Sequence, residues 1–148
     1  MEHITETPTA KGPVERFTGD VYLNMIETPT DPANLAAALV RFTPGARTNW
    51  HSHANGQTLY ITEGVGLVGT RDGNLVRVSA GQIVKCPAGE EHWHGATDTT
   101  LMAHIAMVVG VVGGDGTTWL EPAVRPRTDR PEVAGVEPTA PCRARSRR

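Results

Sequence analysis

The sequence predicts an all-β domain, built as a sandwich or a barrel. Short stretches rich in β-branched and other apolar residues recur along the chain, and Gly, Pro, Asp and Asn separate them. No segment has a strong amphipathic helical period, so helices are not expected to form the frame. The chain has 148 residues, of which 39% are hydrophobic and 20% charged, and this is enough for one domain with its own core.

The first expected strand runs from Asp20 to Ile26 and ends at the turn-rich sequence T-P-T-D-P. The apolar segment Leu35–Phe42 fits a helix or a strand by its pattern alone. Its short length and its bounds at Pro32 and Pro44 favour a strand. Alternate residues of a strand share a face, which groups Ala36, Ala38, Val40 and Phe42.

A second group of strands is expected in the middle of the chain. Thr58–Thr62 is β-branched and aromatic, and we expect Gly64 and Gly66 to break this strand. A hairpin follows over residues 66–78, because the turn from Arg71 to Asn74 contains the Asp-Gly pair typical of tight hairpin turns.

Two further strands complete the expected domain. Gln82–Cys86 follows the Ala-Gly turn at residues 80–81 and ends at a proline. Leu101–Val109 is the longest apolar run and lies between D-T-T and a glycine-rich segment. An uninterrupted apolar run of this length indicates a strand that is buried on both faces.

Composition divides the chain into a lead-in at residues 1–14, a domain at residues 15–120 and a tail at residues 121–148. The tail holds five prolines and seven arginines in 28 residues, so we expect it to be disordered or loosely attached. Its arginines would suit contact with nucleic acid or an acidic surface, or they form a solvated end. The domain itself is acidic and has no basic stripe, so no nucleic-acid partner is expected for it.

The sequence also indicates the cellular compartment and the state of the two cysteines. No apolar run approaches the roughly 18 residues of a membrane span, so no membrane partner is expected. The N-terminus lacks the basic-then-apolar order of a signal peptide, and we therefore expect a cytoplasmic protein. Two cysteines, Cys86 and Cys142, are too few for a disulfide framework and are interpreted as free thiols.

Four residues in two short segments have the spacing of metal ligands. His51 and His53 are two apart, so both side chains point to one face of an extended segment. Gln57 follows a short turn, and His92 follows a Pro-x-Gly turn further along. Imidazole suits Fe, Mn, Co, Ni, Cu and Zn, so these ligands do not fix the metal. The alternatives are ordinary surface or core histidines, or a site of three histidines without the glutamine.

The two segments resemble the motifs of the cupin family. The first reads Gly45-x5-His51-x-His53-x3-Gln57-x6-Gly64, and the second reads Gly81-x5-Pro87-x-Gly89-x2-His92-x3-Ala96. The family has Glu at the position of Gln57 and Asn at the position of Ala96. The resemblance covers roughly residues 15–112. It implies a small single-domain cupin, an antiparallel jelly-roll barrel of two sheets with a divalent metal inside its mouth.

A narrower resemblance is to the bacterial manganese-dependent cupin hydroxynitrile lyases. It is carried by the segments around Lys11, Phe17, Pro44, Trp50, Gly56, Pro87 and His104. It implies that Mn is bound by His51, His53, Gln57 and His92, with Fe, Zn, Ni or Co as alternatives. It implies that His104 moves the proton. Small cupins usually form oligomers, so a homodimer or homotetramer is expected.

Gln57 changes the charge of the predicted site. With Gln in place of Glu all four protein ligands are neutral, and a divalent metal keeps its full charge of +2. Such a metal is a stronger Lewis acid and holds an anion or a polarised oxygen better.

His104 is the only ionisable residue in its apolar run. Burial of an unpartnered imidazole is costly, so the ring needs a partner. Beside a metal cavity it would reach substrate and titrate near neutral pH; the alternative is a bond to a main-chain carbonyl. His94 is expected near the ligands or in the pocket. Small or apolar residues are expected to line the pocket, unless they only pack the core: Ala38, Val40, Met102, Ala106 and Val108.

Three functions follow from these residues. The first is a metal-dependent lyase of the hydroxynitrile-lyase type acting on a small molecule, with His104 as the base. The second is a metal-dependent dioxygenase that binds O₂ beside an organic substrate. The third is a cupin that holds a small ligand without turnover.

Overall fold

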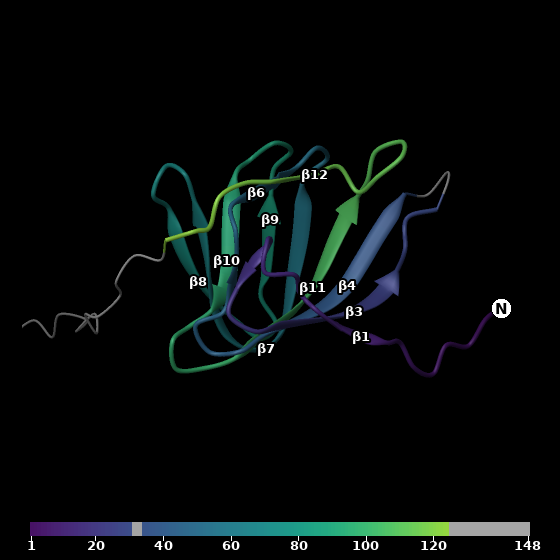
Figure 1. The fold of residues 1–148 in the computed structure, drawn as a ribbon, viewed down its shortest axis with the longest axis horizontal. Coiled ribbons are helices and arrows are strands. Elements are labelled where there is room, and N and C mark those ends of the chain that lie inside the picture. The colour runs from purple at the N-terminus through teal and green to yellow at the C-terminus, as the bar shows by residue number, and fades with distance from the viewer. Residues whose placement is uncertain (31–33, 125–148) are drawn as a thin grey trace, which may run out of the picture.

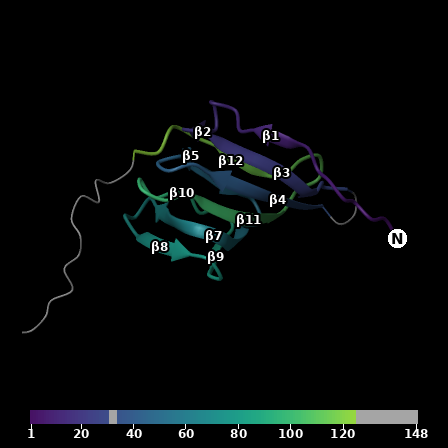
Figure 2. The same cartoon turned by 90° about the horizontal axis from the view of Figure 1, so that it is seen from below.

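The computed structural model describes residues 1–30 and 34–124, and every regular element in them is a β-strand. The strands curl into an antiparallel jelly-roll barrel, seen from the side in Figure 1 and from below in Figure 2. No helix in the described part of the chain is long and apolar enough to cross a membrane. The strands are β1 (Thr9–Lys11), β2 (Phe17–Thr18), β3 (Val21–Glu27), β4 (Leu35–Phe42), β5 (Arg47–Thr48), β6 (His51–His53), β7 (Gln57–Thr70), β8 (Leu75–Ser79), β9 (Ile83–Cys86), β10 (His92–Ala96), β11 (Met102–Val109) and β12 (Thr117–Trp119).

The strand pairs form two halves that meet at β7. On one side, β1, β3, β4, β11 and β7 follow one another, and β9 also pairs with β7. On the other side, β7 continues to β10, β5 and β2, and β8 pairs with β7. β6 pairs with β10, and β12 pairs with β6 across the mouth of the barrel (Figure 1).

β7 corrects the prediction that glycines break this strand. It runs without interruption from Gln57 to Thr70 and passes through Gly64 and Gly66. Its first half pairs with β11 and β9, and its second half pairs with β10 and β8. Gly64 has a φ of 70°, and a side chain there would overlap the carbonyl oxygen of Leu101. This glycine therefore turns the strand from one sheet into the other.

The other predicted strands are present. β4 has the predicted bounds, and β3, β9 and β11 differ from theirs by a residue at one or both ends. The Asp-Gly hairpin joins β7 to β8, with Gly73 at a φ of 88°. In β11 the first three residues are buried, whereas Val109 is 51% exposed. The prediction that both faces are buried therefore holds only for the first part of this strand.

Some residues that composition assigned to the lead-in and to the tail contact the barrel. β1 lies inside the predicted lead-in and pairs with β3. At the other end Ala123 is 1% exposed, and its carbonyl accepts a hydrogen bond from Arg47 Nε at 2.7 Å. Ala123, in the predicted tail, therefore packs on the barrel. Residues 125–148, most of the predicted tail, lie outside the described residues.

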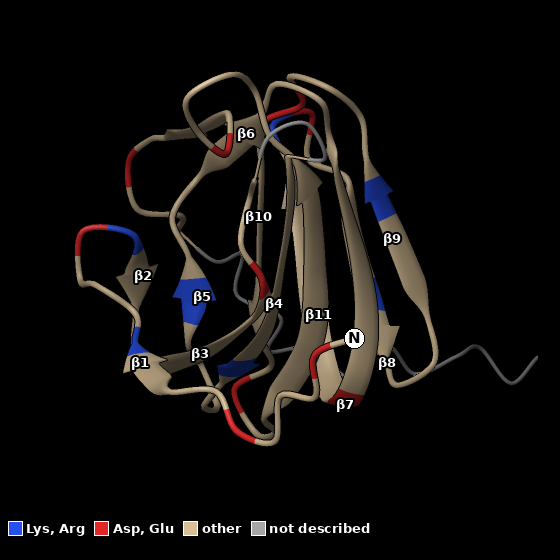
Figure 3. Ribbon diagram, turned by 90° about the vertical axis from the view of Figure 1, so that its right-hand side faces the viewer, with Lys and Arg blue, Asp and Glu red and all other residues tan. Residues whose placement is uncertain are grey.

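The core fills the space between the two halves. Its buried members come from strands of both sides: Phe17, Val21, Val40, Phe42, Ala46, Leu59, Ile61, Val68, Val78, Ala96 and Met102. No Asp, Glu, Lys or Arg is among the buried polar residues of the described chain. In Figure 3 the acidic residues lie largely in the loops at the ends of the barrel. The buried polar side chains therefore include no carboxylate, ammonium or guanidinium group, and most of them are imidazoles.

The bend at Gly64 gives a testable prediction. Gly64→Ala places a Cβ against the Leu101 carbonyl at a positive φ, so it should lower the free energy of unfolding by at least about 3 kcal/mol. Gly81→Ala is the matched control, because Gly81 has a φ of 87° and a Cβ added there would meet no other atom within 4 Å. The control should cost about 1 kcal/mol. Urea denaturation measures both, and equal losses would contradict the steric role of Gly64.

Candidate metal centre

Three histidines converge at the mouth of the barrel. His51 and His53 lie on β6 and, because they are two residues apart, point to the same side. His92 begins β10 and is the register partner of His51. One ring nitrogen from each histidine lies within 4.8 Å of the other two, and all three rings are buried. This spacing is close enough for one ion to bind all three nitrogens.

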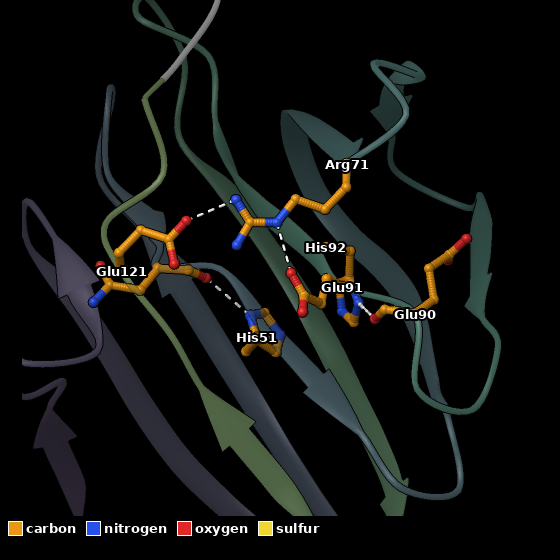
Figure 4. A network of polar contacts seen from close by, with 7 residues as sticks. His51, Arg71, Glu90, Glu91, His92 and Glu121 are labelled. Carbon is orange, nitrogen blue, oxygen red and sulfur yellow. Dashed lines mark hydrogen bonds and ion pairs between the residues drawn. The ribbon is translucent and has the colours of Figure 1, made fainter.

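Gln57 joins the cluster from the first residue of β7. Its Oε1 lies 3.1 Å from His92 Nε2. His92 Nδ1 lies 3.0 Å from the main-chain carbonyl of Glu90, so the proton of a neutral ring belongs on Nδ1 (Figure 4). Two acceptor atoms then face each other, and a cation between them would satisfy both. Residues and fold thus fit a divalent metal at this point.

The other two rings are oriented in the same way. His51 Nδ1 lies 2.9 Å from the carbonyl oxygen of Asn49, which leaves Nε2 free of its proton. His53 Nδ1 lies 3.0 Å from Thr117 Oγ1, and His53 Nε2 is buried without a hydrogen-bond partner. A hydrogen-bond partner on the ring nitrogen that does not bind the metal fixes the tautomer of a metal-binding histidine. Buried polar atoms normally have a partner, and a bond to a metal would satisfy this nitrogen.

Burial keeps the cluster uncharged. It lowers the pKa of His51 to about 3, with a smaller contribution from neighbouring His92. It lowers the pKa of His53 to about 4, again with help from His92, and it lowers the pKa of His92 itself. Because metal binding needs the neutral imidazole, the rings are ready to bind at neutral pH without losing a proton.

His94 and His104 form a second pair beside the first cluster. His104 comes from β11 and His94 from β10, and His104 Nε2 lies 3.2 Å from His94 Nδ1. His94 Nε2 and His104 Nδ1 are buried without partners. Burial lowers the pKa of His104 to about 3 and holds the pKa of His94 well below its usual value. The expectation that His104 titrates near neutral pH is therefore wrong, because the ring is fully desolvated.

A cavity of about 240 Å³ opens beside the three-histidine cluster and the pair His94–His104. Inward-facing residues of β4 and β11 form one wall, among them the predicted Ala38, Val40, Ala106 and Val108. His51, His53, Gln57, His94 and His104 also line it. Met102 does not: it lies at the start of β11, where its side chain is fully buried in the hydrophobic core beside Gly66. The pocket prediction is corrected at this residue.

β12 supplies contacts that the motifs did not reveal. The ring of Trp119 stacks on His51 with centroids 4.7 Å apart and planes at 27°. Thr117 holds His53 and, with Trp119, lines the cavity. Both residues lie outside the ligand motifs, and their β-branched and aromatic types indicated at most a strand. Two charged residues, Arg16 and Asp115, also line the cavity.

Comparison with known proteins agrees with this fold and site. A family model described as a cupin domain matches residues 38–109, and the chain belongs to the cupin family. The chain is 39% identical over 121 residues to an (R)-mandelonitrile lyase of Granulicella tundricola, covering 82% of this chain and 92% of that protein.

Solved structures show the same barrel. A cupin-like protein from Thermotoga maritima is 35% identical with a TM-score of 0.73, over 82% of this chain and 90% of its own. The polyketide cyclase RemF from Streptomyces resistomycificus has a TM-score of 0.58 over 72% and 78% of the two chains. It is 19% identical, so this likeness concerns the fold alone.

The hydrogen bond from β12 to His53 should support metal binding. Thr117→Val removes the hydroxyl at nearly unchanged volume, and loss of such an outer partner should weaken Mn²⁺ affinity about 10- to 100-fold. Titration calorimetry of the metal-free protein measures it. Thr118→Val is the matched control on the same strand, exposed and turned away from the ring, and should bind as the wild type. Equal affinities of the two variants would contradict the role of Thr117.

Metal affinity should depend on pH only in acid, well below the range in which a free histidine titrates. Because the pKa values of His51 and His53 lie at about 3 and about 4, protons compete with the metal only in acid. Mn²⁺ affinity should stay nearly constant from about pH 7.5 to about pH 5.5 and fall steeply below about pH 4. Calorimetry, with circular dichroism to check the fold, measures this. A decline that begins near pH 6.5 would contradict the lowered values.

Proposed function

We propose that this protein is a metal-dependent cupin lyase of the hydroxynitrile-lyase type, which cleaves and forms cyanohydrins. The observation that carries the proposal is the neutral pair His104–His94 lining a cavity beside the set His51, His53, Gln57 and His92. The relative named as an (R)-mandelonitrile lyase supports the reaction class. The resemblance to the manganese-dependent lyases supports Mn²⁺ as the metal.

The reaction divides between the metal ligands and the cavity. A divalent metal held by the three histidines and Gln57 would supply Lewis acidity for the negative charge that develops on the substrate oxygen. The ligands are neutral, so they do not reduce its charge. The wall formed by Ala38, Val40 and Ala106 would hold the aryl or alkyl group of the cyanohydrin and exclude water from it.

His104 would move the proton. Its ring is neutral at neutral pH, so Nε2, which faces His94, can accept the proton of the substrate hydroxyl. The carbonyl forms as the bond between the carbinol carbon and the cyanide carbon breaks, and the electron pair leaves with cyanide. An imidazolium buried this deeply is a strong acid, so it returns the proton to cyanide as HCN. The reverse sequence joins HCN to an aldehyde.

The role of His104 is tested by truncation. His104→Ala should lower kcat for mandelonitrile cleavage about 100- to 10,000-fold, because the proton loses its acceptor. Elemental analysis should find the same metal content as in the wild type, since His104 is outside the three-histidine group. Ile105→Ala is the matched control on β11, and it should keep both activity and metal. Cleavage that survives His104→Ala would overturn the assignment of the base.

The same assay separates the lyase from a dioxygenase. A lyase consumes no O₂, so the rate under nitrogen should equal the rate in air. Dependence of turnover on O₂ would favour the dioxygenase and contradict the proposal. Ligand binding with no turnover in either gas would favour a binding protein instead.

A further inference from the structure

Arg71 contacts three separate segments at the edge of the metal centre. It lies in the turn between β7 and β8, and its Nε is 2.6 Å from Glu91 Oε2. Its Nη1 is 2.7 Å from Glu121 Oε1, and its guanidinium carbon lies 4.0 Å from the centroid of the Trp50 ring. Figure 4 shows the guanidinium between the two carboxylates, above His51 and His92.

Each contacted segment leads directly to the metal ligands. Trp50 precedes His51, and Glu91 precedes His92. Glu121 follows β12, whose Trp119 stacks on His51 and whose Thr117 holds His53. One side chain therefore joins the residues just before His51 and His92 to the end of β12, the strand that contacts His51 and His53.

β12 is a short edge strand, held by β6, by the packing of Trp119 on the core and by contacts beyond its C-terminal end. It is three residues long, and its described strand pairing is with β6 alone. Beyond its end, Leu120 N donates to the Trp50 carbonyl at 2.8 Å, and Trp50 N donates to the Glu121 carbonyl at 3.0 Å. Short edge strands of this kind open easily. Side-chain contacts at the end of β12 therefore affect how often it leaves the histidines.

Charge makes the tie specific. Glu91 and Glu121 both bind one guanidinium, so their carboxylates lie near each other. Without the cation they would repel and push the end of β12 away from the loop before His92. Arg, unlike Lys, can bridge two carboxylates and stack on an indole ring with the same planar group.

We propose that Arg71 is a positioning residue, which keeps β12 closed on the ligand histidines by joining Glu121 to Glu91 and Trp50. Closure keeps Thr117 on His53 and Trp119 on His51. The inference rests on the proposed function only where it concerns the bound metal. In the metal-free protein it predicts a measurable difference in the opening of β12.

Hydrogen exchange in the metal-free protein tests the closure. Arg71→Gln should speed the exchange of the Leu120 and Trp50 amides about ten-fold, from the loss of two partly exposed ion pairs and one cation–π contact. Amides between β4 and β11 should not change. Arg77→Gln is the matched control, because Arg77 is exposed on β8 and forms no ion pair within the described part of the chain. Unchanged Leu120 exchange in Arg71→Gln would overturn the proposal.

Two further variants separate the closure from general destabilisation. Glu121→Gln removes the β12 end of the tie and should also speed Leu120 exchange, whereas Glu91→Gln should speed it less, because Arg71 keeps its contact with Trp50. In the Arg71→Gln background, Glu91→Gln removes the repulsion and should restore part of the slow exchange. No restoration, or unchanged exchange in Glu121→Gln, would contradict the tie between the carboxylates.

Metal release gives the second measurement. Mn²⁺ loss to excess chelator should be about ten-fold faster in Arg71→Gln than in wild type, because β12 leaves the histidines more often. Arg77→Gln should release it at the wild-type rate. If the wild type binds no metal, the proposed function fails while hydrogen exchange still tests Arg71. If exchange changes and metal release does not, the positioning role toward the ligands is wrong.

Discussion

Imidazole crowding in a water-poor space is the constraint on which this structure depends. Five rings share the mouth of the barrel: His51, His53, His92, His94 and His104. A proton added to any ring would be opposed by burial and, for most of them, by neighbouring rings, so all five stay neutral. Neutral rings still need acceptors for their N–H groups, and the surrounding loops supply two carbonyls for this. Burial thus keeps the rings neutral, and this neutrality both requires the hydrogen bonds that orient the rings and leaves nitrogen lone pairs that could bind a cation.

The strands around the rings form two walls. β6, β10 and the start of β7 carry the candidate metal ligands, whereas β4 and β11 carry the cavity wall and His104. β7 belongs to both halves of the barrel, because Gly64 bends it from one sheet into the other. Gln57 lies beside His92 while its own strand pairs with β11. The bend thus connects the strands of the cavity wall to those of the candidate metal centre.

Local patterns account for what the sequence could predict. The i, i+2 spacing of His51 and His53, and the turn before His92, already implied converging side chains, because strand geometry is local. The contacts of Thr117 and Trp119 were out of reach, since they depend on closing the chain over 64 residues or more. Met102 was misplaced because alternation along β11 gives the face of a side chain but not how far along the strand the cavity extends, and Met102 lies in the core. The pKa of His104 needed the extent of burial, which no pattern gives.

The cross-strand pairs of the cavity wall also bear on how new activities arise in this barrel. Ala38 faces Ala106, Ala36 faces Val108, and Val40 faces His104 across β4 and β11. None of these wall residues, apart from His104, has a proposed part in the chemistry. Substitutions among the small side chains of this wall would change the shape of the substrate space without altering the strands that carry the candidate ligands. A lineage could therefore inherit one chemical centre unaltered while it diversifies the molecules that the centre receives.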